Sequence, residues 1–147
     1  MESAVDWSIL KGTMGAKGIP MDCDGMAQRG REFIVFEQKY HIGAQLSMGQ
    51  RICLEALVKV NDNFTVVIIY GPVTAPQRIE VWATGNIQYT FEREKDVPEG
   101  KTSKMVAVLR TISKTWYTAA DSRIKPDFAK LHKRWVEYCS SLTQREV

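Results

Sequence analysis

One continuous apolar segment, residues 64–70 (FTVVIIY), limits the possible folds of this chain more than any other feature. Its β-branched residues predict a strand, and the lack of alternation with polar residues indicates burial on both faces of a sheet. Such strands are typical of parallel pairs, which need a long crossover connection, usually a helix. Apolar residues repeat at helical spacing in the segment just before it: Cys53, Ala56, Leu57 and Val60.

Four other segments complete the predicted sheet. Residues 33–36 (FIVF) form a compact apolar run that predicts a central strand, and residues 20–26 alternate as in a half-buried strand, with a turn at 28–31 between them. Residues 79–82 and 87–91 predict an edge hairpin. We therefore expect an α/β fold with a mixed four- or five-stranded sheet flanked by helices.

Two amphipathic helices are predicted beyond residue 100. Met105, Val108, Leu109, Ile112 and Trp116 are spaced for one helix face, and Phe128, Leu131, Trp135, Tyr138 and Leu142 for another. The 147 residues suit a single domain, 1–147, with a core at about 18–92 and a C-terminal helical pair at about 101–143. Cys23, Cys53 and Cys139 lack zinc-site spacing, so we expect buried free thiols.

The chain contains no apolar run near the roughly 20 residues of a membrane span. Its first residues carry acids and lack the apolar core of a signal peptide, so a cytoplasmic protein is expected. Residues 1–100 hold 10 Lys and Arg and 13 Asp and Glu, a net charge of −3, whereas residues 101–147 hold 10 and 4, a net charge of +6. An acidic site beside a basic region suits a metal-using enzyme that acts on nucleic acid, and solvated helix faces are an equally good explanation.

Three residues of the predicted hairpin form the candidate site. Glu37 and Lys39 follow the apolar strand two residues apart, so they project from the same face, with Gln38 turned away. Twelve residues separate Asp24 from Glu37, which fits two antiparallel strands joined by a turn. If the hairpin pairs in this way, two carboxylates and one ammonium group meet at one spot.

This combination suits phosphodiester cleavage. Asp24, Glu37 and the backbone carbonyl of Gln38 offer the oxygen ligands that Mg²⁺ (or Mn²⁺) prefers. A bound cation polarises the phosphate and lowers the pKa of water, while Lys39 can orient the water or stabilise charge that develops on the phosphate. An isolated E-x-K triplet is common on exposed strands, but here it follows an acid-bearing strand and precedes a crossover helix and a buried strand.

In these residues the chain resembles the PD-(D/E)XK nucleases, which share the restriction-endonuclease-like fold. The resemblance covers about residues 18–92, is carried by segments 20–24, 33–39 and 47–50, and is closest in layout to small phage-encoded nucleases and more distant from archaeal Holliday junction resolvases. It implies a DNA nuclease in the cytoplasm (of a host cell if the chain is phage-encoded), with catalytic and metal-binding roles for Asp24, Glu37 and Lys39.

Several assignments stay open within this resemblance. Asp22 shares the spacing of Asp24 and is an alternative metal ligand, although the distance to Glu37 favours Asp24. Gln50 stands where related enzymes often have a glutamine near the site, and it also has the capping-box spacing to Ser47. The sequence leaves open whether six basic residues contact DNA phosphates or only solvent: Lys17, Arg29, Arg31, Lys130, Lys133 and Arg134.

A rival function belongs to a different class. The same fold could serve as a DNA-binding or protein-interaction module without catalysis. An intact Asp-Glu-Lys set argues against this, because a DNA binder gains nothing from carboxylates that face phosphates. The oligomeric state is open, with a homodimer as one option.

Overall fold

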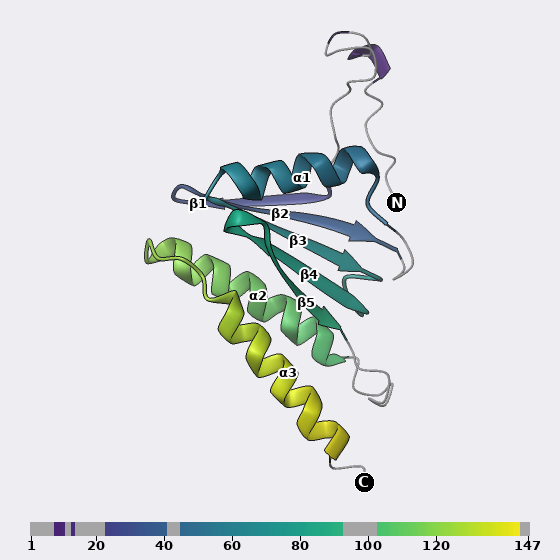
Figure 1. Cartoon of the computed structure of the whole chain (residues 1–147), viewed down its shortest axis with the longest axis vertical. Helices are drawn as coiled ribbons and strands as arrows, with labels where there is room; N and C mark the ends of the chain where they lie inside the picture. The colour runs from purple at the N-terminus through teal and green to yellow at the C-terminus, as the bar shows by residue number, and fades with distance from the viewer. Residues whose placement is uncertain (1–7, 11–12, 14–22, 41–44, 93–102, 145–147) are drawn as a thin grey trace.

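The chain folds into three layers, with one sheet between helices on both of its faces (Figure 1). The structure is a computed structural model that describes residues 8–10, 13, 23–40, 45–92 and 103–144. Five strands follow each other across the sheet: β1 (Gly25–Arg29), β2 (Glu32–Lys39), β3 (Phe64–Tyr70), β4 (Arg78–Ala83) and β5 (Ile87–Glu92). Helix α1 (Met48–Val60) covers one face, and α2 (Ser103–Asp121) and α3 (Phe128–Gln144) cover the other. The predicted α/β class, with a mixed sheet and two C-terminal helices, is confirmed.

Strands β1 and β2 form the predicted antiparallel hairpin, but β1 lies later in the chain than expected. It begins at Gly25, and the turn consists of Gly30 and Arg31 alone. Gly30 has a φ of 60°, the left-handed conformation that a tight turn needs and glycine adopts readily. Because Gly25 belongs to the last pair of the ladder, Asp24 lies one step beyond it, opposite Glu37. Asp24 therefore precedes the strand, whereas the sequence placed it inside one.

Strands β2 and β3 run parallel, and α1 connects them, which confirms the predicted crossover. Residues 65–70 of β3 are all buried, as expected for a strand covered on both faces. Helix α1 begins with the predicted capping box: the Ser47 hydroxyl accepts a hydrogen bond from the Gln50 N–H, and the Gln50 side chain accepts one from the Ser47 N–H. This box fixes the first turn of α1 near the end of β2.

The face that α1 turns toward the sheet differs from the predicted one. Leu54 and Val58 are buried there, whereas Cys53, Ala56 and Val60 are exposed. Apolar residues surround most of this helix, so their periodicity does not define a single buried face. Leu46 and five residues on the α1 face of the sheet complete this buried cluster: Val35, Val66, Ile68, Tyr70 and Trp82.

The predicted edge hairpin is formed by β4 and β5, which pair antiparallel through a short 3-10 turn, η2 (Thr84–Asn86). A second 3-10 turn, η1 (Ser8–Leu10), is the only regular element described before β1. The predicted apolar faces of α2 and α3 are buried or half-buried at every position whose side chain the structure describes; the side chain of Leu142 lies outside that set. Their fully buried members are Met105, Ile112, Trp116 and Phe128, which pack on Ile34, Val67, Ile69, Val81 and Phe91.

The three cysteines do not share one environment. All are free thiols, but only Cys139 is buried; Cys23 and Cys53 are exposed, so the prediction of burial was wrong for both. No helix in the described part of the chain is long and apolar enough to cross a membrane.

Candidate functional site

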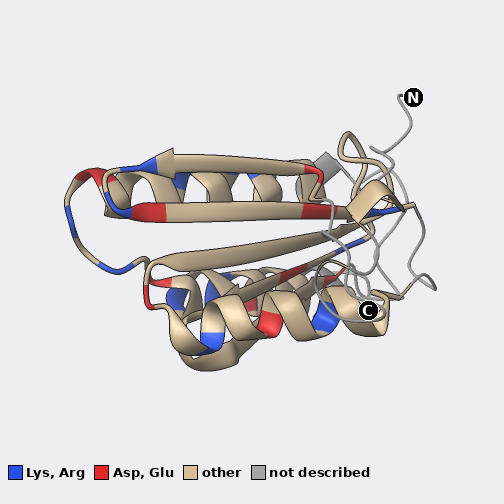
Figure 2. Ribbon diagram, turned by 90° about the horizontal axis from the view of Figure 1, so that it is seen from above, with Lys and Arg blue, Asp and Glu red and all other residues tan. Residues whose placement is uncertain are grey.

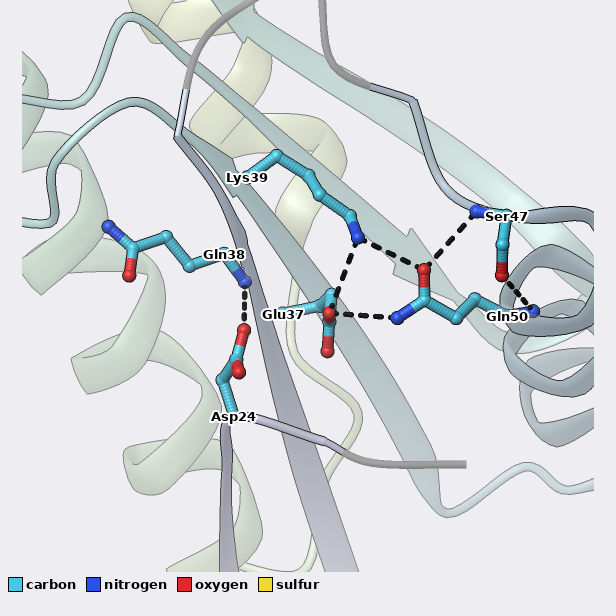
Figure 3. Close-up of polar contacts among 6 residues, drawn as sticks. All are labelled: Asp24, Glu37, Gln38, Lys39, Ser47 and Gln50. Carbon is cyan, nitrogen blue, oxygen red and sulfur yellow. Dashed lines mark hydrogen bonds and ion pairs between the residues drawn. The ribbon is translucent and has the colours of Figure 1, made fainter. Parts of the chain in front are cut away.

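Three side chains meet where β2 ends and α1 begins (Figure 3). Glu37 and Lys39 occupy alternate positions of β2, so both point to the face that α1 covers. Gln50 reaches them from the first turn of α1. The side chain of Gln38 points away, and its Nε2 donates a hydrogen bond to the carbonyl of Gly71 at 3.0 Å. The structure thus brings together three of the residues that the sequence singled out.

The amide of Gln50 lies between the two charged groups. Its Nε2 donates to Glu37 Oε1 at 3.0 Å, and its Oε1 accepts from Lys39 Nζ at 3.0 Å. Lys39 Nζ lies 3.6 Å from Glu37 Oε1, which is an ion pair but longer than a hydrogen bond. An ammonium group has three N–H donors, so Lys39 keeps donor capacity for a further acceptor.

Gln50 also completes the capping box of α1. Its Oε1 accepts a second hydrogen bond, from the Ser47 N–H at 3.2 Å, while its own N–H donates to Ser47 Oγ at 3.1 Å. The two interpretations that the sequence left open, a site residue and a capping residue, therefore hold for the same side chain.

Asp24 approaches the site from the other side of β2. Its Oδ2 accepts a hydrogen bond from the backbone N–H of Gln38 at 2.7 Å. The carboxylate thus replaces the backbone acceptor that a paired strand would provide, at the residue just before β1 begins. The N–H and C=O of one strand residue point to the same neighbour. The carbonyl of Gln38 therefore also faces the side of Asp24.

The carboxyl group of Glu37 is held in an unfavourable environment for its charge. Its side chain is only 7% exposed. Burial raises the pKa of Glu37 above its ordinary value, and the negative charge of Asp24 raises it further. Lys39 and Gln50 act in the opposite direction but do not cancel these effects. A cation near both carboxylates would stabilise the ionised form.

The residues fit a hard cation that keeps part of its water shell. Mg²⁺ is usually bound by one or two carboxylates together with waters and phosphate oxygens, and Asp24 and Glu37 are such a pair. Within the described residues, no three His, Cys, Asp or Glu side chains form a group that could hold a metal. A closed protein cage is therefore absent from this part of the chain. Asp22, the alternative ligand, lies outside the described residues.

The predicted DNA-binding residues that the structure describes lie away from these side chains. Arg29 and Arg31 are at the β1–β2 turn, at the opposite end of β2 from Lys39, and Arg29 forms an ion pair with Asp121. Lys17 lies outside the described residues. The other three are exposed on α3, across the sheet from α1: Lys130, Lys133 and Arg134. The structure does not gather the five described basic residues of this set around Glu37.

A second polar cluster beside the site was not predicted. In the sheet register, Glu37 lies opposite Ile68, and Ile68 lies opposite Glu80, so the three residues form one row across β2, β3 and β4. Glu80 is buried, and its carboxylate lies 3.9 Å from Arg78 Nη2. The sequence signal was the i, i+2 spacing of Arg78 and Glu80, which matches that of Glu37 and Lys39.

Tyr70 joins this cluster to the row that contains Lys39. In the sheet register, Lys39 lies opposite Tyr70, and Tyr70 lies opposite Arg78. The Arg78 guanidinium lies 5.4 Å from the centre of the Tyr70 ring. Burial and a hydrogen bond to Glu80 raise the pKa of Tyr70 to about 12. The phenol therefore stays protonated at neutral pH and donates to the buried carboxylate.

Comparison of this chain with family models, with curated proteins and with solved structures finds no match.

Proposed function

We propose that this chain is a Mg²⁺-dependent nuclease that hydrolyses DNA phosphodiester bonds, with a PD-(D/E)XK site on a restriction-endonuclease-like core. One observation carries the proposal: at the end of β2, Glu37 forms an ion pair with Lys39, and Asp24, from a different segment, binds the N–H of Gln38 between them and acts on Glu37 through its charge. The parallel β2–β3 pair and its crossover helix support it further, because they follow the motif in the order that the resemblance implies.

Each residue has a distinct role in this proposal. Asp24 and Glu37 hold the cation, with the Gln38 carbonyl as a further oxygen ligand. Bound Mg²⁺ lowers the pKa of water and offsets the negative charge that develops on the phosphate. Lys39, which is 18% exposed and keeps unused N–H donors, donates to a phosphate oxygen or to the attacking water. Gln50 is a positioning residue that sets the distance between Lys39 and Glu37.

The reaction consumes one water molecule for each bond. The water oxygen attacks phosphorus, the bond from phosphorus to the leaving oxygen breaks, and the leaving oxygen takes up a proton. The products are a phosphate monoester and a free hydroxyl. Lys39 stabilises the extra charge on the phosphate during this step, so its loss should slow the reaction more than it weakens DNA binding.

The test is cleavage of linear, branched and circular DNA by purified protein, with Mg²⁺, with Mn²⁺ and with chelator. We expect metal-dependent cleavage, lowered roughly 10²–10³-fold by Lys39→Ala. DNA binding in Ca²⁺ should be largely intact in this variant. Lys59→Ala is the matched control, because it removes an exposed lysine near the last turn of α1.

Two outcomes would overturn the proposal. Lys39→Ala protein that cuts at the parent rate would exclude the assigned role of the lysine. Parent protein that binds DNA but cuts no substrate with either metal would support a binding module without catalysis.

A further inference from the structure

A basic pocket lies at the other end of β2 from the candidate site. The β1–β2 turn and the α2–α3 loop enclose a cavity of about 650 Å³. Several Lys, Arg, Asp and Glu residues lie on the ribbon at this end of the molecule (Figure 2). Six of them line the pocket: Arg29, Arg31, Glu32, Asp121, Arg123 and Lys125. Four are basic and two acidic, so the pocket has an excess of two positive charges.

The two acids are already paired. Arg29 Nε donates to Asp121 Oδ1 at 3.0 Å, and the Arg29 guanidinium lies 5.4 Å from the centre of the Tyr117 ring. Lys125 Nζ lies 3.9 Å from Glu32 Oε1. These contacts connect the hairpin to α2 and to the loop after it, so they give the pocket a fixed wall.

Two arginines carry the excess charge. Arg31 and Arg123 are both exposed, and the side chain of neither has an ion pair or hydrogen bond to any described residue. They come from opposite sides of the pocket, Arg31 from the β1–β2 turn and Arg123 from the end of α2. Guanidinium groups have five N–H donors in a planar arrangement that matches phosphate oxygens.

The backbone of Arg123 gives independent support. Its φ is 57°, the left-handed conformation in which a helix commonly ends. Its N–H donates to the carbonyl of Ala120 at 3.2 Å, and the next N–H, of Ile124, to that of Ala119 at 2.9 Å. Glycine is preferred in such a position because a side chain costs free energy there. An arginine in this place is not explained by the needs of the helix end, and Arg123 is one of the residues that line the pocket.

We propose that this pocket binds a backbone phosphate of DNA between Arg31 and Arg123, at a distance from the bond that is cut. The proposal rests on the proposed function for the identity of the ligand. Glu37 lies six residue steps after Arg31, a span of about 20 Å at 3.3 Å per residue. This span corresponds to about six base pairs along a duplex. The pocket would thus hold the DNA well outside the cleavage site.

The test compares the salt dependence of DNA affinity in the parent and in the double variant Arg31→Ala/Arg123→Gly. Glycine suits the left-handed backbone, so this variant should melt at or above the parent temperature. Loss of the one phosphate contact that the two arginines share should reduce the slope of log K against log salt by about 0.9 for a 20-base-pair duplex in Ca²⁺. The double variant Arg110→Ala/Lys114→Ala removes two exposed charges elsewhere on α2 and should leave the slope unchanged.

The outcomes separate this proposal from the nuclease proposal. A reduced slope supports the pocket even if the parent cuts no DNA. An unchanged slope overturns it even if the parent cuts and Lys39→Ala does not. If inorganic phosphate raises the melting temperature of the parent but not of the double variant, while the DNA slope is equal in both, the pocket binds free phosphate and the proposal is wrong.

Discussion

Replacement of Gln50 by alanine should both destabilise the fold and weaken the site. The side chain takes part in three hydrogen bonds, with Glu37, Lys39 and the Ser47 N–H. A bond to a charged group contributes about 1.5–3 kcal/mol and a bond between neutral groups about 0.5–1.5 kcal/mol, which gives at most about 3.5–7.5 kcal/mol. Water can replace part of this at a site that is open on one side. We therefore expect a loss of about 2–4 kcal/mol in the free energy of unfolding.

This loss is large enough to measure by thermal unfolding without metal. For a domain of this size, it corresponds to a decrease of about 4–16 °C in melting temperature. Ser47→Ala is the matched control, because it removes only the capping hydrogen bond to the Gln50 N–H and should cost about 1 kcal/mol. A Gln50→Ala protein that melts within about 1 °C of the parent, or above Ser47→Ala, would refute the reasoning.

The same pair of variants separates positioning from stability. Without the Gln50 amide, Lys39 loses its 3.0 Å acceptor and can approach Glu37 directly. DNA cleavage should then fall by about tenfold or more in Gln50→Ala at a temperature where it is folded. Ser47→Ala should cut at nearly the parent rate. Equal losses of cleavage in both variants would mean that Gln50 acts only through the helix.

Three further predictions concern charge. The pKa of Glu37 is raised in the folded state, so ionisation of this group lowers the stability of the parent as pH rises. In chelator, the melting temperature of Glu37→Gln relative to that of the parent should therefore increase between about pH 4 and pH 7. A difference in melting temperature that does not change with pH would contradict this. Asp24→Asn should lose Mn²⁺ binding in calorimetric titration, while its melting temperature without metal stays near or above that of the parent. Asp22→Asn should keep measurable DNA nicking. The reverse result would exchange the roles assigned to the two aspartates. Alanine at three exposed residues of α3 should reduce the slope of log K against log salt for DNA binding by up to about 2.7: Lys130, Lys133 and Arg134. An unchanged slope would mean that these residues contact only solvent.

Local patterns were sufficient to predict much of the fold. The run of apolar residues in β3 and the capping box at Ser47 and Gln50 depend on neighbours within a few positions, and both are present as predicted. Glu37 and Lys39 share a face for the same reason, since the strand period alone decides it. The position of β1 was harder to predict, because it depends on the length of the turn before β2, which Gly30 closes in two residues.

The rest of the site depends on contacts that sequence spacing does not encode. Tyr70, Arg78 and Glu80 become neighbours of Lys39 and Glu37 only because β3 and β4 follow β2 in the sheet. The side chain of Gln50 was assigned to either the helix or the site, and its dual role follows from the close approach of two distant segments. Burial of Leu54 and Val58 was missed because α1 is apolar around most of its circumference.

The two carboxylates each have one oxygen already engaged, and this bears on which cation they can hold. Asp24 Oδ2 accepts the Gln38 N–H, and Glu37 Oε1 faces both Gln50 and Lys39. The second oxygen of each group would be the more available one for a cation, which would favour binding through a single atom. Such single-oxygen binding suits the strict octahedron of Mg²⁺, whereas Ca²⁺ takes six to eight ligands and often binds both oxygens of a carboxylate. The backbone and amide donors around the site would therefore select the metal by limiting how many oxygens it can reach.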